Sequence, residues 1–128
     1  MNIIRREHIV SPLNKTWIFD LDGTVVKHNG YKNEGQDTLL GGAKEFFANI
    51  PNNDMIVFIT SREEKYKVTT ELFLTKSNIR FDTIIYGAPY GERILINDAK
   101  PSGLQTAIAV NTERDVFMTE GFVVDQSL

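Results

Sequence analysis

The chain has 128 residues and a formal net charge of −3. This length favours one domain with a modest core, and the slightly acidic balance predicts no broad basic surface for nucleic acid. The sequence has no cysteine, which excludes disulfides and thiolate metal sites. No apolar run approaches the ~20 residues of a membrane span, and the first residues lack the features of a signal peptide. We therefore expect a cytoplasmic protein that does not enter a membrane.

A predicted strand followed by two acids stands near the start of the chain. Thr16–Phe19 is a short run of aromatic and β-branched residues, which is typical of a buried strand. Side chains two apart on an extended chain point to the same side, so Asp20 and Asp22 are predicted to face one pocket. Their mutual repulsion favours a cation or a shared proton between them, and Mg²⁺ suits oxygen ligands of this kind. The alternative is a strand that ends in a solvated acidic turn.

The rest of the chain alternates between apolar runs of strand length and helical patterns. In chain order we expect edge-strand residues at 3–4 and 8–10, a loop or small hairpin over 27–37, a helix over 38–50, a strand at 55–59, a helix over 63–77, strands at 83–86, 94–96 and 107–110, and a last strand or docked tail at 121–124. Strands that alternate with helices or long crossovers favour a mostly parallel sheet between helical layers. The predicted fold class is therefore α/β, with a three-layer, Rossmann-like arrangement.

Polar residues also follow two of the later predicted strands. Thr60 and Ser61 follow the second of the central strands, where hydroxyl groups can bind a phosphate oxygen. The alternative role is helix capping, and both roles hold if Ser61 caps the helix while Thr60 faces the pocket. Asn97 and Asp98 follow the predicted strand at 94–96, where a plain turn is the alternative.

The segment FDLDGT at Phe19–Thr24 resembles the first motif of the haloacid dehalogenase-like (HAD) superfamily. The resemblance implies that Asp20 is a nucleophile that forms an aspartyl-phosphate. It also implies that Asp22 is the general acid and base, and that its main-chain carbonyl binds Mg²⁺ together with Asp20.

Two further segments extend this resemblance. IVFITSR resembles the second motif, which implies that Thr60 binds the phosphoryl group. ILIND resembles the fourth motif, an apolar strand whose terminal acid completes the Mg²⁺ site. Asp98 is the implied metal ligand, and whether Asn97 also reaches the ion stays open.

The chain departs from the family at the third motif, which is a lysine commonly followed by proline. Ala88 and Pro89 stand at that place, although a cation is needed there to offset the nucleophile and the phosphate. Lys100 is the nearest substitute, and Arg62 and Arg93 are weaker candidates. The alternative for Lys100 is an exposed turn residue.

The resemblance covers roughly 15–110 of a predicted single domain of residues 1–128. In the HAD fold the strand order is 3-2-1-4-5, which brings the motif-bearing strand ends to one edge. The gaps at 25–41 and 60–94 leave no room for an inserted cap domain, so the chain resembles the capless type. An open pocket of this kind would accept large substrates or be closed by a neighbouring subunit, and a homo-oligomer is a further expectation.

The leading hypothesis is a Mg²⁺-dependent phosphohydrolase that cleaves a phosphate monoester, with a small phosphorylated molecule as substrate. One alternative is a catalytically weakened relative with a regulatory or structural role, since the motif lysine is missing. Another is a receiver-like signalling domain that accepts a phosphoryl group. That domain needs an acid after the middle strand, and Thr60 stands there instead.

Overall fold

The computed structural model describes residues 6–128, so the expected edge-strand residues at 3–4 lie outside the described part of the chain. In chain order the elements are β1 (Glu7–Val10), β2 (Thr16–Asp20), α1 (Gly30–Asn33), α2 (Ala43–Ala48), β3 (Met55–Ile59), a 3₁₀ turn (Glu64–Tyr66), α3 (Lys67–Lys76), β4 (Thr83–Ile85) and β5 (Gly121–Val124). Within residues 6–128, no helix has the length and apolar character needed to cross a membrane.

The central sheet contains β2, β3 and β4 in that spatial order, and both strand pairs are parallel. Phe58 of β3 lies in register with Phe19 of β2 and with Ile84 of β4. The apolar run of β3 suits this central position, because a strand flanked on both sides and covered by helices is buried along most of its length. The α/β class and the 3-2-1 part of the predicted strand order are therefore confirmed.

A second, two-stranded sheet joins the two ends of the described chain. Strands β1 and β5 pair in parallel, with His8 opposite Phe122, and these two rings stack with their centroids 5.2 Å apart. The structure thus confirms the edge strand predicted around 8–10 and the last strand predicted at 121–124.

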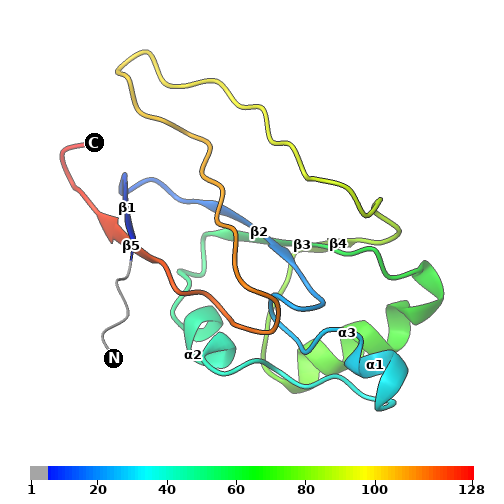
Figure 1. Ribbon diagram of the computed structural model, residues 1–128. Coiled ribbons are helices and arrows are strands. Elements are labelled where there is room, and N and C mark those ends of the chain that lie inside the picture. The colour runs from blue at the N-terminus through cyan, green and yellow to red at the C-terminus, as the bar shows by residue number, and fades with distance from the viewer. Residues whose placement is uncertain (1–5) are drawn as a thin grey trace.

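The strands predicted at 94–96 and 107–110 are wrong. Residues 92–110 form no regular element, and Ile94 and Ile96 are 80% and 86% exposed. Figure 1 shows this segment, in yellow and orange, running away from the sheet and turning back. The reason is local pairing, because the N–H of Lys100 bonds to the carbonyl of Leu104 and the Thr106 hydroxyl bonds to the carbonyl of Asp98. Apolar composition alone could not distinguish this excursion from a strand.

The structure also refines the predictions for the three segments that contain helices. The segment 27–37, expected as a loop or hairpin, contains the short helix α1, and the helix expected over 38–50 is limited to α2. The helix expected over 63–77 is present as the 3₁₀ turn followed by α3. In Figure 1, α1, α2 and α3 lie on the same side of the central sheet, so the described residues have one helical layer where a three-layer fold has two.

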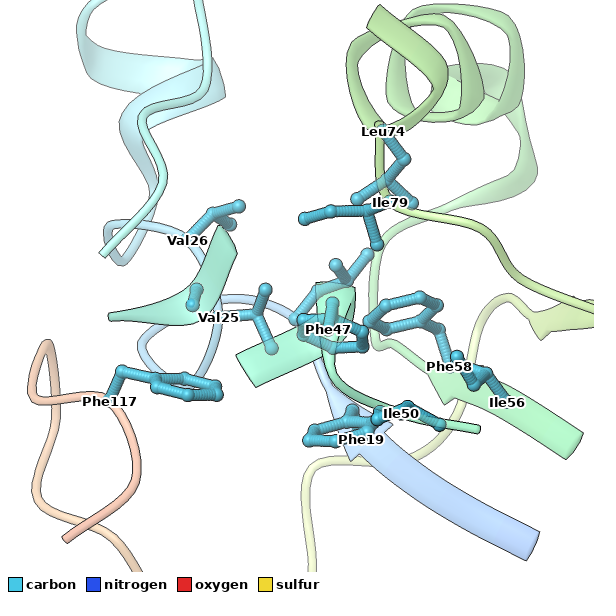
Figure 2. Packing of buried hydrophobic residues seen from close by; sticks show 12 residues of the cluster. Phe19, Val25, Val26, Phe47, Ile50, Ile56, Phe58, Leu74, Ile79 and Phe117 are labelled. Carbon is cyan, nitrogen blue, oxygen red and sulfur yellow. The ribbon is translucent and has the colours of Figure 1, made fainter. Parts of the chain in front are cut away.

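The hydrophobic core lies between the sheet and these helices. Figure 2 shows Phe47 of α2 between Val25 and Phe58. The ring of Phe47 is 4.6 Å from that of Phe19 and 5.7 Å from that of Phe58, measured between centroids. Phe117 reaches the same core from the C-terminal part of the chain. Because Phe19 immediately precedes Asp20, this packing anchors the end of β2 that carries the acids.

Asp54 holds the start of the sheet together. Its carboxylate accepts bonds from the Asn14 amide, the Lys15 N–H and the Trp17 indole N–H at 3.0–3.1 Å. Burial of Asp54 works against its charged form, but the bonds from Trp17, Asn14 and Lys15 outweigh burial and lower the pKa of Asp54 below its ordinary value. The charged form is therefore part of the folded structure.

We predict that Asp54→Ala lowers the free energy of unfolding by about 1–3 kcal/mol at pH 7, because three donors lose their acceptor. The control is Asn53→Ala, in the same turn and exposed. A group whose pKa is lower in the folded state than in the unfolded state stabilises the fold at pH values above its unfolded pKa. The difference in unfolding free energy between the wild type and Asp54→Ala should therefore shrink as the pH falls below about 4. Urea unfolding between pH 2 and pH 7 measures these free energies. Equal stability of the two variants at pH 7 would contradict the stabilising role of Asp54.

Candidate active site

A tight turn after β2 places Asp20 and Asp22 at the carboxyl end of that strand. The carbonyl of Leu21, a buried residue, accepts the N–H groups of residues 24, 25 and 26 at 2.9–3.1 Å. Gly23 has φ +82°, and a Cβ there would lie 3.3 Å from Cγ of Arg114. Glycine suits this turn because other residues seldom adopt positive φ.

Asp20 is the more accessible of the two acids. Its Oδ2 accepts a 2.9 Å bond from the Thr24 hydroxyl, which orients the carboxylate within the turn. Its Oδ1 lies 2.9 Å from Nη1 of Arg93, and both side chains of this ion pair are about one third exposed. Asp20 therefore has one oxygen held by its own turn and one paired with a cation that is partly in solvent.

Asp22, in contrast, is held by a buried arginine. Arg62 donates from Nε to Oδ2 and from Nη2 to Oδ1 of Asp22, both at 3.0 Å. The same guanidinium donates to both oxygens of Asp37, at 2.9 and 2.6 Å, and to the Thr70 hydroxyl at 2.9 Å. The side chains of Arg62, Asp37 and Asp22 are 1%, 6% and 17% exposed. We call Asp22, Arg62 and Asp37 the acid–arginine–acid cluster.

The cluster is closed on one side by an aromatic ring. The guanidinium carbon of Arg62 lies 4.0 Å from the ring centroid of Tyr31, a distance at which a cation and a ring attract each other. Burial opposes the charge of Arg62, but its bonds to Asp37 and Asp22 and their negative charges raise its pKa above the ordinary value. Arg62 is therefore a permanent cation shared between two carboxylates.

A cavity of about 390 Å³ opens beside these groups. The structure brings both acids to it, together with Ser61, Lys32, Arg93 and Arg114. The lining is mixed in charge, since Glu63 also faces the cavity, and the basic side chains outside the cluster are the groups that can attract an anion. This combination of an accessible carboxylate and nearby cations can bind a phosphate group and present a nucleophile to it.

The structure differs from the roles predicted for Thr60 and Ser61, because Ser61 meets the cavity in place of Thr60 and neither side chain caps the helix that follows. Thr60 is fully buried, and its hydroxyl oxygen accepts the N–H of Arg62 at 3.1 Å. Ser61 lines the cavity instead. The reason is that Thr60 follows the central strand directly and stays in the core, whereas the next residue is the first to leave the sheet.

Asp98 and Lys100, the predicted metal ligand and phosphate-binding cation, lie in the excursion at 92–110. Neither lines the cavity, and Asn97 pairs weakly with the carbonyl of Thr106. Among residues 6–128 the structure brings together no group of three His, Asp or Glu side chains that could hold a metal. The described site therefore contains Asp20 and Asp22 without the third predicted acid.

Sequence reasoning missed Asp37 altogether. The residue lies in a polar loop between α1 and α2 without periodicity or motif, so no local signal distinguishes it from its neighbours. The sequence indicates Arg62 and Arg93 only as substitutes for the missing lysine, and the structure gives them separate partners, Asp22 and Asp20.

No protein-family model matches the chain, and a search of curated proteins finds no match. Two solved structures are similar to it. One is titled "Structure of Pnkp1/Rnl/Hen1 complex", with 26% identity, a TM-score of 0.50, and 66% of this chain and 32% of that chain covered. The other is titled "Structure of the Pnkp1/Rnl/Hen1 RNA repair complex", with 26% identity, a TM-score of 0.50, and 67% and 30% covered. The chain thus matches about a third of the length of chains found in an RNA repair complex.

We predict that Arg62→Ala lowers the free energy of unfolding by roughly 3–5 kcal/mol, because it leaves two largely buried carboxylates without their cation. Lys65→Ala is the matched control, since Lys65 pairs with Glu63 at 3.6 Å in an exposed position and should cost less than ~1 kcal/mol. Urea unfolding at pH 7 gives both values. Similar losses for the two variants would show that the cluster does not stabilise the fold.

Proposed function

We propose that this chain is a Mg²⁺-dependent phosphohydrolase of the HAD type that cleaves phosphate monoesters. The observation that carries the proposal is the pair of acids in the DxDGT turn, at the carboxyl end of a parallel strand and beside a cavity lined with cations. Ligands of open α/β sheets bind at this edge. The similarity to chains of an RNA repair complex is compatible with a phosphorylated substrate.

Asp20 is the nucleophile in the proposed reaction. The bond from Thr24 to Oδ2 leaves Oδ1 to approach the phosphorus once Arg93 turns to the phosphate. The new bond joins Oδ1 to phosphorus while the bond from phosphorus to the ester oxygen breaks. Asp22 enters this step carrying the proton that it took from water in the preceding turnover, and it gives that proton to the leaving oxygen. Asp22 then takes a proton from water, whose oxygen attacks the phosphorus and releases inorganic phosphate from Asp20.

Arg93 takes the place of the missing motif lysine in this proposal. All five N–H donors of Arg62 are already used by Asp22, Asp37 and Thr70. Lys100 lies at the turn of the excursion at 92–110, outside the cavity lining. Arg93 lies near the start of the same excursion, where it is partly exposed, touches Asp20 and lines the cavity. Its guanidinium can move from one carboxylate oxygen to a phosphate oxygen, which it binds well.

The residues present suit a magnesium ion. The Asp20 carboxylate and the main-chain carbonyl of Asp22 are hard oxygen donors at one strand end, and Mg²⁺ commonly completes its shell with waters and substrate phosphate oxygens. These two groups would hold the ion, and Asp98 has no part in the arrangement that the described residues show. When bound, Mg²⁺ would neutralise charge on the phosphoryl group.

We expect phosphate release from at least one monoester class only when Mg²⁺ is present, and its loss in Asp20→Asn, which removes the nucleophile. A screen should compare sugar phosphates, nucleoside monophosphates and RNA oligonucleotides with a terminal phosphate, each with Mg²⁺ and with a chelator. Activity that survives in Asp20→Asn would contradict the proposed mechanism. No turnover on any class would favour the regulatory or structural alternative.

We predict that Arg93→Ala lowers turnover by about 10²–10³, the usual cost of losing one positioned donor to developing charge. Lys100→Ala is the control and should retain near-wild-type turnover, because Lys100 lies outside the cavity lining. Steady-state kinetics on the best ester measures both. A loss of turnover in Lys100→Ala together with near-wild-type turnover in Arg93→Ala would mean that the excursion at 92–110 closes over the cavity during the reaction.

A further inference from the structure

We propose that Arg62 and Asp37 are positioning residues that hold the carboxylate of Asp22 at the angle its proton transfers require. The inference rests on the proposed function, since it concerns the acid and base of that reaction. It assigns a role to Asp37, a residue with no motif in the sequence, and removes Arg62 from the candidates for phosphate binding.

Arg62 and Asp22 form a pair with a defined geometry. Two parallel bonds of 3.0 Å join Nε and Nη2 of Arg62 to the two oxygens of Asp22. A planar guanidinium with two bonds to one carboxylate sets both the direction and the plane of that carboxylate. A single bond, or a lysine ammonium, would fix only a distance.

The guanidinium of Arg62 is itself held in place by further partners. Its other edge gives two bonds to Asp37, at 2.9 and 2.6 Å, and one to Thr70, so all five of its donors have partners. The ring of Tyr31 covers one face. No donor is left for a phosphate oxygen, and the group cannot rotate without breaking several bonds in a buried place.

The partners of Arg62 come from three separate segments of the chain. Asp22 follows β2, Arg62 follows β3, and Thr70 belongs to α3. Asp37 comes from the loop after α1. The cluster therefore ties the acid to the sheet and to the helical layer at once, and a small displacement of such a group can cost about 10² in rate.

The test is Asp37→Asn, in which one oxygen becomes an NH₂ group that faces the donors of Arg62. We expect kcat to fall at least tenfold with little change in KM, because the substrate still meets Asp20, Ser61 and Arg93. The affinity for inorganic phosphate, measured by calorimetry, should stay within twofold. Glu34→Gln is the matched control, an exposed acid of the same loop that pairs with Lys27, and it should leave kcat unchanged.

Two further variants keep the test decisive if Asp37→Asn folds poorly. Asp37→Glu retains the charge and should recover part of kcat, whereas Arg62→Lys retains the charge but loses the paired bonds and should stay low in kcat.

Three results would overturn the inference. The first is a kcat of Asp37→Asn within twofold of wild type. The second is a loss of phosphate affinity equal to the loss of kcat, which would make Arg62 a phosphate ligand. The third is an absence of turnover in the wild-type chain, which would remove the proposed function and this inference together. The first two leave the proposed function intact.

Discussion

The structure depends on the burial of one arginine between two carboxylates. A guanidinium that is almost fully enclosed is costly unless each of its donors has a partner, and Arg62 obtains those partners from Asp22, Asp37 and Thr70. The partners lie on segments that are distant in the chain. Satisfying one buried charge therefore ties the turn after β2, the loop before α2 and the helix α3 to the end of β3.

This constraint gives the two acids of one turn different surroundings. Asp22 is locked in the acid–arginine–acid cluster, whereas Asp20 is partly exposed and paired with Arg93 at the cavity. The difference suits a division of work in which one carboxylate is accessible to a substrate and the other keeps a fixed direction. Local geometry places the two acids at one strand end. Their different partners then leave one carboxylate accessible and hold the other in a fixed direction.

Much of the fold was predictable because its signals are local. The apolar runs of β2, β3 and β4 and the helical pattern of α3 are present where expected. The run at 94–96 has the same composition as a buried strand but lies exposed. Nothing in its composition encodes that the chain reverses near Lys100 and pairs with itself, since pairing depends on residues outside the run.

The sequence by itself determined the apolar strands and the position of Asp20 and Asp22 at the end of one of them. It did so because side-chain alternation and strand composition act over a few residues. Only the tertiary structure decided which cation belongs to which acid, that Asp37 shares Arg62, and that Ser61 rather than Thr60 meets the cavity. Those choices follow from the pairing of buried charges and polar groups across distant segments, where long-range packing selects the partner and sequence spacing does not.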